Sequence, residues 1–430
     1  MKFNINSQNT LNFLVLSLFF FLPFERIPTF ELAGFTVKIS YLFGLLVLVL
    51  LFTRNSLLQT INESWSSRFL TFFWSLSFVS SLFFSPNLKR SLIFLGLWLF
   101  VFLLYLLLPK YLTKPGARDQ IYSIIILSSC LVCLFGLYQF IGDSLGLSQS
   151  LTGLRIQYTK IVMGFPRIQS VALEPLYFAN FLIVPFFLSL WRYIKSKSFF
   201  GLYFWTSFLI LTNVILTISR GAFIAVSLSL ILLLFYLFLN RVQGQYLKKV
   251  FAILTVLLLS LAISFLLITK LNGRQAASNF ADHSVVENVQ ADGSAYDRIG
   301  TYKIALNQFR EKPFLGNGVG SFGVLSRDTT PAGNPGLGVV NNEYLEILSE
   351  TGIIGLGLFL LFLIYFLKEG WRGYREANPA KKLIITILFL SLFAIFIQYN
   401  FFSTLYIIYI WAFLALFKSE IDTPLKGVSS

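Results

Sequence analysis

Charged residues are scarce in this chain: they make up 12% of its 430 residues, about half the share found in an ordinary soluble domain. Hydrophobic residues make up 56%. Histidine occurs once, at His283, which excludes a metal site built on histidines. Cysteine occurs twice, and Cys130 and Cys133 lie in an apolar segment without the strand and helix context of a redox pair. The sequence therefore predicts an integral membrane protein with no histidine-built metal site and no redox pair of cysteines, and no cofactor is expected.

Long apolar runs recur along the whole chain. A membrane core of about 30 Å needs roughly 20 mostly apolar helical residues, and about twelve segments approach that length. The predicted spans are 10–24, 35–53, 68–84, 91–108, 120–141, 170–190, 200–218, 221–239, 250–269, 352–367, 383–401 and 403–417. The run from Leu202 to Leu239 would be about 57 Å long as one helix, so it must fold back near Ser219-Arg220-Gly221. We expect an all-α, polytopic protein.

The basic residues predict how the spans are oriented. Lys2 and the segments around Arg54, Lys110, Lys195 to Lys197 and Arg372 to Lys382 would all lie on one side of the membrane, and the short loops of the other side carry far fewer basic residues. By the positive-inside rule, that basic side is cytoplasmic. The basic residues of the cytoplasmic side also account for much of the net charge of +15. Little positive charge is then left to explain by a nucleic-acid partner, and none is expected.

Two long loops then lie outside, at 142–169 and at 270–350. We predict one membrane domain, 1–430, in which the second loop carries short helices and precedes the last three spans. Pro23-Phe24-Glu25-Arg26 offers no small-residue cleavage site, so the first span is predicted to be retained.

Polar residues near the predicted outer face are candidates for chemistry. Arg220 occupies the tight return between two apolar helices, where it either extends to the interface or binds an anion. Glu174 precedes Pro175 at the outer start of a span, which is the cap position of a helix that begins with proline. Its carboxylate either caps that helix or faces a polar cavity as a functional group.

The large loop contains a helical pattern followed by glycines. Ile299, Tyr302, Leu306 and Phe309 recur at helical spacing, with Arg298 near the start of the helix. Gly316 and Gly318 follow Pro313, in a loop that is either simply mobile or able to bring its backbone near a phosphate. No strand precedes these glycines, which excludes a nucleotide-binding motif.

The segment Asn341 to Gly357, NNEYLEILSETGIIGLG, joins a polar, acidic helical segment to the entry of a span. Glu343 and Glu350 lie on its polar side, and Gly352 and Gly355 allow a neighbouring element to approach closely. It is either an interfacial lead-in to the span or part of an active site.

Taken in order, these features resemble the bacterial O-antigen ligase and polymerase superfamily. The resemblance rests on four features, namely Ser219 to Gly221, the helix start Tyr296-Asp297-Arg298 with Pro313, Gly316 and Gly318, the pattern Asn342, Leu345, Leu348, Glu350, Gly352, Gly355, and about a dozen spans with one large external loop. It covers the C-terminal half well and the first five spans by topology alone.

The resemblance implies a metal-independent, inverting glycosyl transfer at the outer face of the bacterial inner membrane. The donor would be a glycan on undecaprenyl diphosphate, and the acceptor a glycan or lipid A core. Family members hold the diphosphate with two arginines, which match Arg220 and Arg298 here. Guanidinium groups suit this role because they meet phosphate oxygens in a bidentate manner.

Ligases of this family place a histidine, as the base, where this chain has Asn341. An asparagine amide cannot accept a proton at neutral pH, so Asn341 can only orient an acceptor. Glu174 is the preferred carboxylate base and Glu343 the second choice. The missing histidine and the Glu-Pro pair favour a repeat-unit polymerase. A ligase to lipid A core or to protein is the near alternative, and a lipid-linked glycan flippase is the non-enzymatic one.

Overall fold

The computed structural model describes residues 7–26, 29–32, 35–114, 116–240, 246–284, 293–326, 338–403 and 405–422. In this part of the chain, helices occupy every predicted span. Eight of them are long and apolar enough to cross a membrane. These eight are α4 (Trp65–Phe84), α5 (Leu88–Leu112), α6 (Ala117–Ser144), α9 (Pro175–Lys195), α11 (Arg220–Asn240), α12 (Tyr246–Asn272), α16 (Glu343–Glu376) and α17 (Pro379–Gln398). The chain is an all-α, polytopic membrane protein.

The other four predicted spans contain shorter helices. These are α1 (Ser7–Phe21), α2 (Ile39–Phe52), α10 (Leu202–Leu216) and α18 (Ile408–Asp422). α10 ends and α11 begins on either side of residues 217–219, so the long apolar run folds back where the sequence predicts. The fold-back confirms the length argument.

One predicted span starts too early. Residues 35–38 form a strand, β2 (Phe35–Lys38), which pairs antiparallel with β1 (Thr29–Leu32) ahead of α2. Hydrophobicity alone did not reveal this hairpin. Two of the four residues of β2 are apolar and one is a β-branched threonine, and this composition suits a strand as well as a span. The smaller helices are α3 (Leu57–Asn62), α7 (Gln149–Thr152), η1 (Ile156–Tyr158), α8 (Lys160–Met163), α13 (Arg274–Ser284), α14 (Gly293–Glu311) and α15 (Phe322–Leu325).

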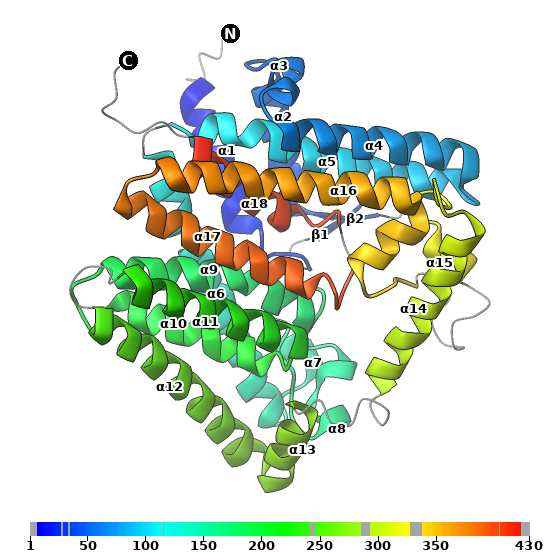
Figure 1. The fold of residues 1–430 in the computed structure, drawn as a ribbon. Coiled ribbons are helices and arrows are strands. Elements are labelled where there is room, and N and C mark those ends of the chain that lie inside the picture. Colours follow the sequence, from blue (N-terminus) through cyan, green and yellow to red (C-terminus); the bar gives the residue numbers. More distant parts are fainter. Residues whose placement is uncertain are drawn as a thin grey trace, which may run out of the picture. The chain divides into compact units, whose positions relative to one another are not determined.

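The chain folds into two compact units, each built from separate segments. The first unit comprises Met1–Val47, Lys114–Val286 and Asn378–Ile395. In it, α10 packs against α9, α12 and α6 (Figure 1). α9 forms the centre of this unit, since 89% of its most apolar 18-residue stretch is buried.

The second unit comprises Leu48–Thr113, Glu287–Ala377 and Phe396–Ser430. α16 lies along α4 and contacts α14, and α18 packs on α5 (Figure 1). Aromatic rings fill its core, with the Phe102 and Trp411 centroids 4.4 Å apart. The segment 270–350 is divided between the units, because α13 belongs to the first and α14 and α15 to the second.

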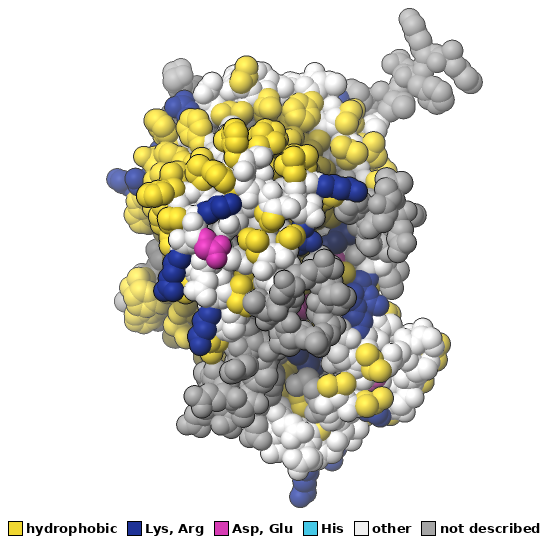
Figure 2. Space-filling model, turned by 90° about the vertical axis from the view of Figure 1, so that its right-hand side faces the viewer, with side chains coloured by type: hydrophobic (Ala, Val, Ile, Leu, Met, Phe, Trp, Pro, Cys, Tyr) yellow, Lys and Arg dark blue, Asp and Glu magenta, His cyan; other side chains and the backbone are white. Residues whose placement is uncertain are grey.

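Large apolar side chains are exposed along the long helices. Phe83 of α4 is 76% exposed and Leu258 of α12 is 65% exposed. Figure 2 shows hydrophobic side chains gathered in the upper part of one view of the protein. Such surfaces are unfavourable in water and suit contact with lipid chains.

Candidate functional site

Glu174 stands at the start of the buried helix α9, in the cap position that the sequence predicts. Pro175 is the first helical residue, and Glu174 has an extended backbone with φ −146° and ψ 160°. Its side chain nevertheless makes no capping hydrogen bond to the described first turn of α9. The side chain is half-buried. The carboxylate therefore does not serve as the cap of α9, which is the structural role that its position in the sequence would suggest.

Tyr158 lies close enough to Glu174 and to Arg167 for both charges to act on its phenol. Burial and, after it, the charge of the Glu174 carboxylate raise the pKa of the Tyr158 phenol to about 12, while Arg167 and Arg155 oppose the rise. The Arg167 guanidinium lies 5.9 Å from the centre of the Tyr158 ring. At neutral pH Tyr158 is thus a neutral hydrogen-bond donor beside a carboxylate and two arginines.

Arg167 also holds the turn that leads to Arg220. Its Nε donates to the Thr217 carbonyl and its Nη2 to the Ile218 carbonyl, each at 3.2 Å. Ile218 has φ +54°, a left-handed conformation that is strained for a β-branched residue. Arg220 follows two residues later as the first residue of α11. The first unit therefore gathers Glu174, Tyr158, Arg167 and the turn before Arg220 into one polar cluster.

Sequence reasoning missed Tyr158 and Arg167. A signal was present, because the predicted external loop 142–169 carries Arg155, Lys160 and Arg167, although positive residues are depleted on that side of the membrane. Basic residues that break this rule are candidates for binding an anion.

The second unit contains the start of α16, where two asparagines have separate roles. Asn341 has φ +58°, which asparagine tolerates better than most residues, and this left-handed residue turns the chain into the helix. Asn342 caps α16, because its Oδ1 accepts the Leu345 N–H at 3.0 Å. Its own N–H donates to Ser403 Oγ at 3.0 Å. The segment is fixed by backbone and cap bonds before any substrate is present.

Arg298 and Tyr302 lie one turn apart on α14, beside these asparagines. The Tyr302 hydroxyl donates to the Asn341 carbonyl at 3.3 Å and to the Asn400 carbonyl at 2.9 Å. Burial raises the pKa of Tyr302, while the charge of Arg298 and a hydrogen bond with the Asn342 side chain lower it. The structure therefore brings together Arg298, Tyr302, Asn341 and Asn342. The side chains of Tyr296 and Asp297 lie outside the described residues, as does that of His283.

Two glutamates on successive turns of α16 hold the loops around it. Glu346 Oε2 accepts the Val340 N–H at 3.0 Å, and Glu350 Oε1 accepts the Phe322 N–H at 3.1 Å. Leu345 packs against the buried cluster of Ala305, Phe322 and Val340. Glu350 is 3% exposed, so it acts as a structural anchor in this arrangement.

Glu343, the second candidate base, is also enclosed. It is 1% exposed, and its backbone N–H donates to the Tyr399 carbonyl at 2.8 Å. A carboxylate so deeply buried meets an acceptor hydroxyl less readily than the half-buried Glu174 does.

The glycines Gly316, Gly318 and Gly352 form a backbone clasp. Gly352 has φ +67° and ψ −173° and interrupts α16 at the residue where the sequence predicts the span to begin. Gly316 and Gly318 are also left-handed. A Cβ on Gly352 would lie 2.3 Å from the Phe314 carbonyl oxygen, and one on Gly316 would lie 2.4 Å from that of Glu350. Only glycine allows these two backbones to approach so closely.

Hydrogen bonds from the loop replace those that the broken helix loses. The N–H groups of Asn317 and Gly318 donate to the Ser349 and Glu350 carbonyls at 3.2 and 2.8 Å. The Ile353 N–H donates to the Pro313 carbonyl at 2.8 Å. The N–H groups of Asn317 and Gly318, which a phosphate-binding loop would offer to its ligand, therefore already form hydrogen bonds with α16.

The comparison with known families agrees with the motifs of both units. The family model described as O-antigen ligase (Wzy_C) matches residues 205–360, a little over a third of the chain. Residues 205–360 are thus similar to the O-antigen ligases, in agreement with the resemblance that the motifs indicate. The matched segment contains Arg220, Arg298, the glycine clasp and the start of α16, and it ends shortly after Gly352. No curated protein matches the chain.

Proposed function

We propose that the protein transfers a glycan from undecaprenyl diphosphate to a sugar hydroxyl, as an inverting, metal-independent membrane glycosyltransferase. The similarity of residues 205–360 to O-antigen ligases supports glycosyl transfer with a lipid-linked donor and a separate acceptor. The observation that carries the catalytic assignment is the cluster in the first unit. There Glu174 makes no capping bond to the described turn of α9 and lies near Tyr158, over whose ring the Arg167 guanidinium lies.

In the proposed step, the acceptor hydroxyl attacks the anomeric carbon of the donor sugar. The bond from that carbon to the acceptor oxygen forms as the bond to the diphosphate oxygen breaks, with inversion. The hydroxyl proton passes to the Glu174 carboxylate, and the electron pair of the broken bond leaves with undecaprenyl diphosphate. Asn341 orients the acceptor, since an amide cannot take the proton.

Arg220 and Arg298 each bind the donor diphosphate in this proposal. The leaving group gains negative charge during the reaction, and fixed guanidinium donors stabilise that charge more than they stabilise the bound donor. Arg220 at the N-terminus of α11 has the added benefit of the positive end of a long helix. The glycine clasp and the Glu346 and Glu350 bonds keep the start of α16 rigid beside Arg298 and Tyr302.

The acceptor that we propose is another repeat unit, so that the enzyme is a polysaccharide polymerase of the outer face of the bacterial inner membrane. Asn341 in place of the family's catalytic histidine favours this assignment. The similarity of residues 205–360 to O-antigen ligases favours transfer to lipid A core as the second candidate.

Deletion of the gene separates the two candidates. The polymerase proposal predicts surface core that carries a single repeat unit. Bare core with accumulated lipid-linked polymer would instead identify a ligase. Unchanged surface glycan together with an unchanged lipid-linked pool would contradict both.

A further inference from the structure

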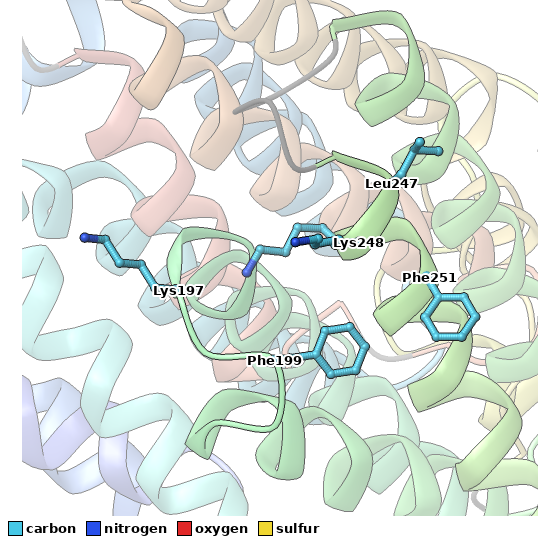
Figure 3. Close-up of a pocket in the computed structure, with 6 residues that line it drawn as sticks. Lys197, Phe199, Leu247, Lys248 and Phe251 are labelled. Atoms are coloured by element: carbon cyan, nitrogen blue, oxygen red, sulfur yellow. The ribbon is translucent and has the colours of Figure 1, made fainter.

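A basic cavity in the first unit lies outside the proposed catalytic machinery. Its volume is about 670 Å³, and it lies between the α9–α10 connection and the first turns of α12 (Figure 3). Its lining residues are Lys197, Phe199, Leu247, Lys248, Lys249 and Phe251. Lys197 and Phe199 come from the connection and the other four from α12. Nothing in the proposed glycosyl transfer uses this cavity.

The three lysines bring positive charge that no acidic side chain of the described residues neutralises through an ion pair. Lys249 is 9% exposed, and its Nζ donates to the Tyr193 carbonyl at 3.2 Å and to the Ser196 carbonyl. It also lies 4.7 Å from the centre of the Tyr193 ring. Among the described residues no carboxylate forms an ion pair with any of the three lysines. An anion bound in the cavity would compensate this charge.

The cavity is also apolar on one side. The Phe199 and Phe251 ring centroids are 6.4 Å apart, which joins the connection to α12. Leu247 is 67% exposed and Phe251 65% exposed. Along α12, at helical spacing, the exposed residues Leu254, Leu258, Leu261 and Phe265 continue this apolar surface. A ligand that complements both the lysines and this apolar surface has a negatively charged head and hydrocarbon chains.

We propose that this cavity binds the headgroup of an anionic phospholipid. The phosphate meets the ammonium groups of Lys197 and Lys248 at the positive end of α12, and the acyl chains run along the exposed apolar stripe of that helix. Lys249 fixes the start of α12 to the end of α9, which shapes the cavity. The positive-inside pattern predicts this end of the spans to be cytoplasmic, the side where polybasic sites meet anionic lipids.

Native mass spectrometry of the full chain in detergent, titrated with phosphatidylglycerol and separately with phosphatidylcholine, tests the proposal. Each lysine near an anionic lipid contributes about fivefold to affinity, so the double variant K197Q/K248Q is expected to bind phosphatidylglycerol roughly 25-fold more weakly. The matched control K381Q/K382Q removes the same charge from the first turn of α17 and is expected to bind like the unmodified protein. Thermal unfolding without added lipid shows whether the variants remain folded.

A free phosphate ion is the other source of the same chemistry. The lipid proposal predicts that F251A weakens phosphatidylglycerol binding and that inorganic phosphate at millimolar concentration does not displace the lipid. Displacement by phosphate with no effect of F251A would show a soluble-anion site and overturn the proposal. Equal binding of phosphatidylglycerol and phosphatidylcholine, or equal losses in K197Q/K248Q and K381Q/K382Q, would overturn it as well.

Discussion

Replacing Glu174 with glutamine separates a catalytic carboxylate from a structural one. Glutamine keeps the size of the side chain and removes its ability to accept a proton. If Glu174 is the base, we expect transfer to slow by about 10² to 10⁴. A helix cap contributes about 1 kcal/mol, but this side chain makes no capping bond to the described turn of α9. We therefore expect the free energy of unfolding to change by no more than about 1 kcal/mol.

The assay is initial-rate transfer by purified protein from a lipid-linked donor, with thermal unfolding of the same preparation in detergent. Asn341→Ala is expected to lower the rate less than Glu174→Gln does, because on this hypothesis the amide only orients the acceptor. Glu343→Gln provides the competing case, since Glu343 is 1% exposed. Normal transfer by Glu174→Gln together with no transfer by Glu343→Gln would show that the base belongs to the start of α16 and would refute the assignment.

Three further predictions follow from the site and the fold. Arg220→Ala and Arg298→Ala are each expected to lower turnover by about 10² or more at normal protein levels, with lysine restoring only part of the rate because it lacks the bidentate fork. Normal glycan chains from both alanine variants would remove the diphosphate assignment. Gly352→Ala should destabilise the protein by about 3 kcal/mol or more, because its left-handed φ is strained for alanine and its Cβ would clash with the Phe314 carbonyl. Gly357→Ala in the same helix, with nothing within 4 Å of its Cβ, should be neutral, and equal effects in thermal unfolding would argue against the clasp. Single cysteines within 195–197 and 372–382 should be protected from an impermeant reagent in intact spheroplasts, whereas cysteines within 282–341 should react. The reverse pattern would overturn the orientation.

Local chemistry explains what the sequence could predict. The order Glu174-Pro175 indicates a helix that begins with proline, and α9 begins there. The length of the apolar run from Leu202 to Leu239 required a fold-back, and the chain turns there between the end of α10 and the start of α11. Apolar windows located each span, although the hairpin before α2 shows that four residues rich in apolar and β-branched types do not reveal their own conformation.

What the sequence could not predict depends on contacts between distant segments. The break at Gly352 is stable because the backbone near Phe314 supplies hydrogen bonds that the interrupted helix loses. The left-handed conformation of Ile218 depends on Arg167, about fifty residues earlier in the chain, whose guanidinium binds the turn. No local pattern around either residue contains this information.

Purified protein in vesicles, supplied with single repeat units on undecaprenyl diphosphate and with a metal chelator, tests the central claim most directly. The account predicts longer lipid-linked chains, release of one undecaprenyl diphosphate for each linkage formed, inverted anomeric configuration, and a rate that the chelator does not change. Intact donor after prolonged incubation with folded protein, or movement of the donor across the vesicle membrane without any new linkage, would contradict glycosyl transfer and favour a transporter.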